Sequence, residues 1–360
     1  MQPTTTTARA WLAAAVLTAL CAQSAQSQTL YAYRLAQQKI GCFAEGINDS
    51  GQIVGTHDQG SGVAFLSLPH GGAIRNLSQP GDMWSKATAV NNAGVVIGRY
   101  RDALGQWLTF LTDADGANRR PYPLPPGMAS FGPRDLNDAG QVLGARDGEA
   151  SAIVQADGFS WQDVEAPADA VGPVALRLNE SGQVIGWASF APPSTATYGF
   201  VTGPGGLGAA WLRTPATHLA VYVHGLNDLG QVAGTLTTLN ESTRGFISNP
   251  GPSGGAYLKR AGQPHDSIEV LGIDSQGRAY GSLHEKLPSG ERRRFAYVAG
   301  PDRKVVDLNP LVVNLPPGVA LKQVRDINRN GQMAVQAGTL GGEDNNICYI
   351  VCPEPRCTPG

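Results

Sequence analysis

One short pattern of apolar and polar positions recurs along most of the chain. An apolar residue precedes Asn or Asp, two variable residues, Gly and a second apolar stretch, as in "GINDSGQIVG" at 46–55. Seven copies occur, at 46–55, 89–98, 135–144, 177–186, 225–234, 272–281 and 326–335. Their central glycines are 43, 46, 42, 48, 47 and 54 residues apart. A spacing of about 46 residues suits four short strands with their turns, so each copy predicts one blade of a β-propeller.

Each copy of the phrase predicts a tight hairpin turn. Asn or Asp at the first turn position can accept hydrogen bonds from backbone N–H groups two residues on. The Gly then takes the left-handed conformation that closes a type I turn with a bulge. The turn residues are Asn48, Gly51, Asn91, Gly94, Asn137, Gly140, Asn179, Gly182, Asn227, Gly230, Asp274, Gly277, Asn328 and Gly331. Consecutive apolar residues after the Gly, such as Ile53 and Val54, predict a strand that is buried on both faces.

Two further strands are expected after each hairpin, with one exception. Apolar runs such as "VAFLSL" (63–68) predict the third strand, and segments such as "KVVDL" (304–308) predict the fourth. The seventh copy stops after its third run at 348–353, whereas "TLYAYRLA" (29–36) precedes the first copy and has no blade of its own. We therefore expect an all-β fold, a seven-bladed β-propeller of four-stranded antiparallel blades, whose N-terminal strand closes the last blade.

The first 28 residues differ from the rest. Arg9 precedes an apolar stretch at 11–21, and small and polar residues follow it. This order predicts a secretory signal peptide at 1–28, cleaved after Ser24 or Ser27, and a single propeller domain at 29–360. No later stretch approaches the ~20 apolar residues that a spanning helix needs. We expect an exported, soluble monomer without a transmembrane segment.

Four cysteines remain after removal of the signal peptide. They are Cys42, Cys348, Cys352 and Cys357. An even number in an exported chain predicts disulfides, for which three pairings exist. A zinc site is the alternative, although the spacing lacks the paired CxxC of zinc folds. Because the two chain ends are expected in one blade, we favour Cys42–Cys348 as the bond that holds the ring closed, with Cys352–Cys357 as a local loop.

Composition supports short strands and argues against a nucleic-acid partner. The chain has 46 Gly and 25 Pro, with 42% hydrophobic and 16% charged residues, so a large core and many turns are expected. The formal net charge is −2, and the densest basic cluster is the short "ERRRF" at 291–295. A solvated loop explains such a cluster better than contact with phosphates.

At the level of these phrases the sequence resembles the HAF-repeat extracellular proteins of bacteria. "VAF" (63–65), "YGF" (198–200) and "RGF" (244–246) stand where that family has His-Ala-Phe, with the His replaced in all three. The resemblance covers essentially all of the chain after the signal peptide. It implies export to the periplasm or the cell exterior and a repeat fold, and it implies no catalytic residue.

Motifs for cofactors and metals are weak. "GPGGLG" (203–208) matches GxGxxG but is followed by a Pro instead of a helix. "DADGAN" (113–118) lacks the Glu of a calcium loop, because Leu124 stands at the twelfth position. No two histidines have the HxH or HxxxH spacing of a metal site, and no Ser/His/Asp motif occurs. The sequence indicates no cofactor, no metal and no catalytic residue.

The dissimilar loops on the face opposite the phrase turns are the expected place for a ligand. Just past the last Gly of the phrase lie six polar or aromatic residues, which we expect to line a rim for an anionic or sugar-like ligand: His57, Arg99, Tyr100, Arg146, Trp187 and His284. Five tryptophans are either sugar-stacking platforms or packing residues between blades: Trp84, Trp107, Trp161, Trp187 and Trp211.

Two classes of function follow from these features. The first is a non-catalytic binding or interaction scaffold, whose partner is an unidentified glycan, small molecule or protein. The second is a propeller hydrolase or lyase for extracellular polysaccharide, which needs paired carboxylates about 5–10 Å apart in one pocket. The absence of a catalytic motif favours the first.

Overall fold

The computed structural model describes residues 29–35, 41–57, 62–148, 150–155, 158–190, 196–214, 219–237, 243–260, 267–286, 292–340 and 347–353. The expected signal peptide and Cys357 lie outside these residues. Strands dominate, and the helices described are the single turns η1 (Pro69–Gly71), η2 (Ala114–Gly116), η3 (Pro204–Gly206) and η4 (Asn309–Leu311). None of the helices in these ranges is long and apolar enough to cross a membrane.

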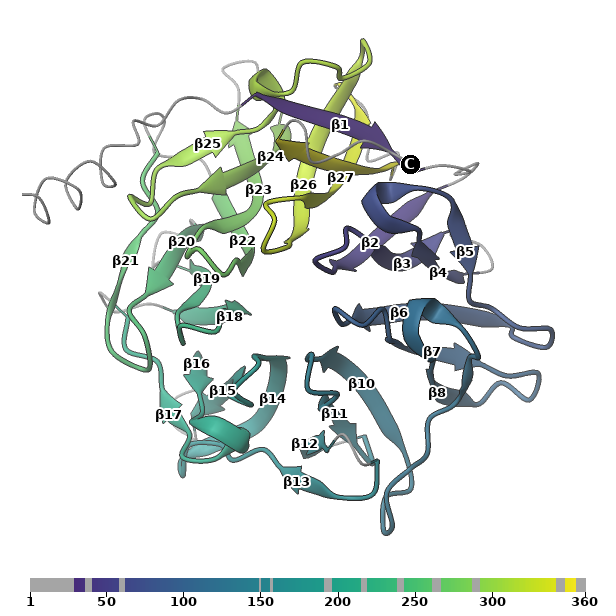
Figure 1. The fold of residues 1–360 in the computed structure, drawn as a ribbon. Helices are drawn as coiled ribbons and strands as arrows, with labels where there is room; N and C mark the ends of the chain where they lie inside the picture. Colours follow the sequence, from purple (N-terminus) through teal and green to yellow (C-terminus); the bar gives the residue numbers. More distant parts are fainter. Residues whose placement is uncertain are drawn as a thin grey trace, which may run out of the picture.

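Antiparallel four-stranded units follow the sequence repeat and stand around a central space (Figure 1). The first three are β2 (Cys42–Ile47), β3 (Ile53–His57), β4 (Val63–Ser67) and β5 (Ile74–Asn76); β6 (Trp84–Val90), β7 (Val96–Arg101), β8 (Trp107–Leu111) and β9 (Arg120–Pro121); and β10 (Phe131–Leu136), β11 (Val142–Arg146), β12 (Ala150–Val154) and β13 (Trp161–Asp163). The next two are β14 (Ala170–Leu178), β15 (Val184–Phe190), β16 (Thr197–Val201) and β17 (Ala210–Trp211); and β18 (Ala220–Leu226), β19 (Val232–Thr237), β20 (Thr243–Ser248) and β21 (Gly255–Tyr257). A parallel pairing of Thr197 with Ala220 joins these two into one eight-stranded sheet. The last two are β22 (Ser267–Ile273), β23 (Ala279–Lys286), β24 (Arg292–Ala299) and β25 (Val305–Asp307); and β26 (Val319–Ile327), β27 (Met333–Thr339), β28 (Ile347–Pro353) and β1 (Leu30–Arg34).

The phrase forms the hairpin between the first two strands of every unit. In the first copy, Gly51 N donates to Asn48 O at 2.9 Å, and Gly51 has φ = +76°. The central glycines of all seven phrases have φ between +73° and +80°, a region that side chains disfavour. All seven phrases therefore form hairpins with the same turn conformation at the central Gly.

In the second, fourth and fifth copies, the last Gly of the phrase makes room for an aromatic ring of the third strand. A Cβ atom on Gly98 would lie 2.5 Å from Cζ of Phe110, and one on Gly186 would lie 2.6 Å from Cζ of Phe200. Both rings are buried, as is Phe65 of the "VAF" segment. The Phe of the repeat is thus a core residue that packs over a glycine of the neighbouring strand.

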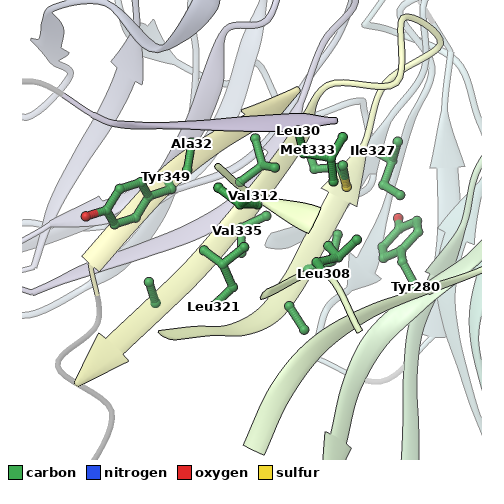
Figure 2. Packing of buried hydrophobic residues seen from close by; sticks show 14 residues of the cluster. Leu30, Ala32, Tyr280, Leu308, Val312, Leu321, Ile327, Met333, Val335 and Tyr349 are labelled. Atoms are coloured by element: carbon green, nitrogen blue, oxygen red, sulfur yellow. The ribbon is translucent and has the colours of Figure 1, made fainter. Parts of the chain in front are cut away.

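The N-terminal strand β1 lies at the outer edge of the last sheet, antiparallel to β28, with Leu30 opposite Pro353. Figure 2 shows Leu30 and Ala32 among apolar residues of that sheet, which include Val335 and Tyr349. Asn314 holds the strand from the other side, because its Oδ1 accepts from Ala32 N (2.7 Å) and its Nδ2 donates to Ala32 O (2.9 Å).

A disulfide links the first sheet to the last. Cys42 on β2 is bonded to Cys348 on β28, with Cα atoms 5.6 Å apart and a sequence separation of 306. This confirms the pairing favoured for these two cysteines. Cys352 is disulfide-bonded as well, and its expected partner Cys357 is not among the described residues.

Candidate functional site

The turn asparagines tie each phrase to the next around the central space. Asn137 Oδ1 accepts from Gln141 N at 2.9 Å, while Asn137 Nδ2 donates to Gln141 Oε1 (2.8 Å) and to Asn179 O (3.2 Å). Equivalent bonds between copies run from Asn48 to Asn91, from Asn91 to Asn137, from Asn179 to Asn227 and from Asn227 to Asp274. Asn328 Nδ2 donates to Asn48 O at 2.8 Å and so joins the last copy to the first. The amides form a ring with one gap, and they tie neighbouring sheets together at six of the seven junctions.

Asp274 interrupts this ring. A carboxylate has no N–H to donate, and Asp274 Oδ2 accepts instead from Arg278 Nε of its own turn, at 2.5 Å. Every other copy supplies Asn at this position. The junction between the sixth and seventh copies therefore lacks the bond that the others have.

Carboxylates and one guanidinium occupy the end of the central channel at the phrase turns. The Arg329 guanidinium lies 3.5 Å from Asp49, 3.7 Å from Asp138 and 3.4 Å from Asp228, which belong to three different copies. Burial opposes its charge, but these three carboxylates raise the pKa of Arg329. Burial also raises the pKa of the neighbouring Glu180. Arg329 thus neutralises part of a ring of negative charge around a cavity of 200 Å³.

An apolar collar lies just inside this end. The residue before the Asn or Asp of each phrase lines the same cavity, and the seven residues are Ile47, Val90, Leu136, Leu178, Leu226, Ile273 and Ile327. Each copy contributes one side chain, so the collar follows from the repeat itself. It separates the carboxylate end from the polar interior of the channel.

Buried polar groups fill the next section, a cavity of 170 Å³. Asp326 accepts from Tyr280 Oη (2.8 Å) and from Ile47 N (3.0 Å), and Asp135 accepts from Leu178 N (2.9 Å). These carboxylates therefore bridge adjacent sheets. Burial raises the pKa of Asp135, and it raises that of Tyr280 well above the ordinary value. The section is a hydrogen-bonded part of the scaffold.

The section farthest from the phrase turns is a basic cavity of 300 Å³. Its cationic lining residues are Lys86, Arg99, Arg134, Arg177 and Arg325, and the imidazole of His224 joins them. The residues described as lining it include no carboxylate. Glu45 stands close by and pairs with both Lys86 (2.8 Å) and Arg325 (3.5 Å). Burial opposes the charge of Arg177, but Asp135 nearby raises its pKa and so compensates it. Arg134 is left without such a counter-charge.

The electrostatics of the basic cavity favour an incoming anion. Burial and the nearby charge of Arg99 lower the pKa of Arg134, which has no hydrogen-bond or ion-pair partner among the described residues. Burial and the charge of Arg177 likewise lower the pKa of His224. Each shift means that the cationic form lacks compensation. An anion between these groups would supply it.

The structure places one of the six predicted rim residues, Arg99, in this cavity. The other five contact groups in the sheets: His57 lies beside Phe65, Tyr100 under the guanidinium of Arg119, Arg146 against Asp163 and Trp161, Trp187 against Tyr222, and His284 near Glu269. The six residues therefore do not form one pocket with each other.

The predicted rim did not include the following residues, which lie on the innermost strands: Lys86, Arg134, Arg177, His224 and Arg325. A signal for them does exist in the aligned copies. The position three residues before the Asn or Asp faces the channel in every copy, where it is occupied by Glu45, Thr88, Arg134, Leu176, His224, Leu271 and Arg325. Three of these seven side chains are basic or imidazole groups, namely Arg134, His224 and Arg325, whereas Lys86 and Arg177 stand at other positions of their copies.

Ser282 and His284 of β23 lie close to Glu269 of β22, although no sequence motif predicted this cluster. Ser282 Oγ donates to Glu269 Oε2 (2.6 Å), and His284 Nε2 lies 3.3 Å from Ser282 Oγ and 3.5 Å from Glu269 Oε2. The hydrogen bond from His284 lowers the pKa of Glu269 to about 2, with help from Ser282 and Arg294. A hydrolytic triad needs the hydroxyl to donate to a His whose other nitrogen contacts the acid, and this arrangement differs.

The tryptophans lie against other aromatic rings or guanidinium groups. Ring centroids are 5.1 Å apart for Trp84 and Trp107, and 4.5 Å apart for Trp211 and Phe190. These contacts favour the packing role over the sugar-stacking one. Among the residues that the structure describes, no group of three or more His, Cys, Asp or Glu side chains is placed to hold a metal ion.

The fold is similar to solved β-propeller structures at low sequence identity. YCF48 from Cyanidioschyzon merolae is 10% identical with a TM-score of 0.58, over 90% of this chain and 99% of that one. The β-propeller domain of the Trilobed protease from Pyrococcus furiosus is 8% identical with a TM-score of 0.53, over 83% of this chain and 92% of that one. No protein-family model and no curated protein matches the sequence. The chain is thus an all-β protein with the fold of a β-propeller.

Proposed function

We propose that this chain is an exported, seven-bladed β-propeller that binds a small anion without chemical conversion. Seven copies of the phrase, seven four-stranded units and the hydrogen bond from Asn328 back to Asn48 support the blade number. The Cys42–Cys348 disulfide supports export to the periplasm or the cell exterior, because such bonds persist in oxidising compartments. The "VAF", "YGF" and "RGF" segments support membership of the HAF-repeat proteins, and we propose a monomer.

The observation that carries the binding function is the uncompensated charge of the basic cavity. Five cationic side chains from four sheets converge there, and Arg134 has no partner within the described part of the chain. A fold does not hold like charges together for stability, because their repulsion and loss of hydration cost free energy. Guanidinium groups bind carboxylate and phosphate oxygens in a bidentate manner, so the ligand carries such groups.

Polysaccharide hydrolysis or lysis, the second class considered, gains no support from this cavity. That chemistry requires two carboxylates facing one substrate. The nearest carboxylate, Glu45, is engaged in ion pairs with Lys86 and Arg325. Asp135 and Asp326 lie deeper, where they accept backbone N–H groups. The lining offers cationic groups for binding and no carboxylate of its own.

Isothermal titration with citrate and with pyrophosphate tests the proposal and separates carboxylate from phosphate ligands. We expect at least one of them to bind, and Arg134→Gln to weaken it about 10- to 150-fold, since a hydrogen bond to a charged group contributes roughly 1.5–3 kcal/mol. Arg120→Gln is the matched control, because Arg120 pairs with Asp113 on an exposed outer strand. If neither anion binds, or if both variants weaken binding equally, the proposal is wrong.

A further inference from the structure

A second cavity lies away from the central channel, between two neighbouring sheets. It has a volume of 440 Å³ and is lined by residues of β23, β24 and β26 and of the segment after β25. None of its lining residues belongs to the basic cavity. It is therefore a separate space, large enough for a small organic molecule.

A buried lysine stands at one side of this cavity. Lys322 is 8% exposed and occupies the register shift of β26 between Leu321 and Gln323. No hydrogen-bond acceptor or carboxylate within the described ranges contacts its ammonium group. Unpaired ammonium groups are rarely buried, because desolvation of the charge costs free energy. Lys322 thus has a buried side chain whose ammonium group faces the cavity without a counter-charge.

The carboxylates near the cavity are engaged elsewhere. Glu285 lies 3.6 Å from Arg260, whose guanidinium also stacks over Phe295. Asp307 accepts hydrogen bonds from the backbone N–H and the side-chain amide of Asn309, at 2.9 and 3.0 Å. Neither acid is left to neutralise Lys322. The exposed Arg293 at the cavity adds a further positive charge.

Apart from Arg294 and Asn309, the rest of the lining is apolar. Leu283, Leu315, Val319 and Leu340 face the cavity together with the ring of Phe295. A hydrocarbon body placed against these side chains would remove apolar surface from water, which is favourable by about 25 cal/mol per Å². An apolar wall beside the cations Lys322 and Arg293 is the complement of an amphiphilic anion.

We propose that this cavity binds a small amphiphilic carboxylate, with its carboxylate on Lys322 and its hydrocarbon chain against Leu283, Leu315 and Val319. The site does not depend on the proposed function of the central channel, because the two cavities share no lining residue. A polar anion such as phosphate satisfies the ammonium but leaves the apolar wall uncovered, and an alcohol does the reverse.

Titration of the folded protein with octanoate, acetate and n-octanol tests the site. We expect octanoate to bind at least 10-fold more tightly than acetate or n-octanol. Lys322→Met should weaken octanoate binding at least 10-fold, while Lys259→Met, which removes an exposed lysine outside the cavity, should leave it unchanged. Arg134→Gln should also leave it unchanged, which separates this site from the central one.

The melting temperature of Lys322→Met shows whether a loss of octanoate binding comes from misfolding. Because the variant replaces an unpaired buried cation by an apolar chain of similar length, its melting temperature should equal or exceed that of the parent. Octanoate binding that survives in a folded Lys322→Met protein overturns the proposal. So does a failure of octanoate to bind the parent protein, or equal loss in Lys259→Met.

Discussion

Asn137 shows how much structure a single side chain of the phrase determines. Its amide is buried, its oxygen accepts from the backbone of its own turn, and its nitrogen reaches both Gln141 and the backbone of the next copy. A side chain of another length or polarity would leave at least one of these buried groups without a partner. The recurrence of Asn is thus explained by the contact between copies as well as by the turn.

Asn137→Ala should lower the free energy of unfolding by about 1–3 kcal/mol, because it leaves Asn179 O and Gln141 Oε1 without this donor. Urea denaturation measures the change. Asn76→Ala is the control, since Asn76 is exposed and accepts only from the local Ser78 N. A loss below about 0.5 kcal/mol in Asn137→Ala would show that the ring of amides is dispensable.

Arg329 should contribute more to the stability of the folded protein at neutral pH than at acidic pH. Removing its charge in Arg329→Gln leaves the carboxylates of Asp49, Asp138 and Asp228 to repel one another. The pKa of Glu180 is already raised by burial, so its ionisation disfavours the folded state above that pKa, and the penalty disappears as pH falls. We expect Arg329→Gln to reduce the melting temperature at pH 7 and to do so much less at pH 4. An equal reduction at both values would contradict this electrostatic role.

At the scale of elements, strand β1 and the disulfide both connect the two ends of the chain. β1 supplies the fourth strand of the last sheet, and Leu30 is buried against that sheet and Val312. Cys42 and Cys348 cross from the first sheet to the last. Both features act where the repeat begins and ends, so their loss should open the ring at one place.

Leu30→Ala should destabilise the protein by about 2–5 kcal/mol, the usual range for truncating a buried leucine. Thermal or urea unfolding under non-reducing conditions measures the effect. Leu104→Ala provides the comparison, because Leu104 is 83% exposed and contributes little to the core. If Leu30→Ala unfolds at the same denaturant concentration as Leu104→Ala, β1 does not hold the last sheet together.

Much of the fold could be predicted from the sequence because the spacing of the seven copies can be counted directly. The Gly of each phrase predicted a hairpin, and the apolar pair after it predicted the second strand. The strand expected at 29–36, which had no blade of its own, predicted the partner of β28. The candidate site could not be located in this way. Arg134, Arg177 and Arg325 belong to separate copies, are not adjacent in sequence, and meet only once the sheets are arranged around the channel. All six rim residues lie on the second strand of their sheets, one strand outside the innermost strand that lines the channel, and only Arg99 reaches the basic cavity from there.

At the scale of the whole molecule, the channel has opposite charge at its two ends. Carboxylates surround Arg329 at the end with the phrase turns, and cations surround His224 at the other end. The formal net charge of −2 conceals this separation. An anion is therefore attracted to one end of the channel only, and the apolar collar lies between the two ends.

A crystal structure of the protein grown with selenate tests the central claim most directly, because selenium reveals the position of the anion by anomalous scattering. We predict a selenate in the basic cavity, within hydrogen-bond distance of Arg134 and of Arg177 or Arg325, and its loss in Arg134→Gln crystals. Selenate bound elsewhere on the surface, with no anomalous density in the basic cavity, would contradict the account.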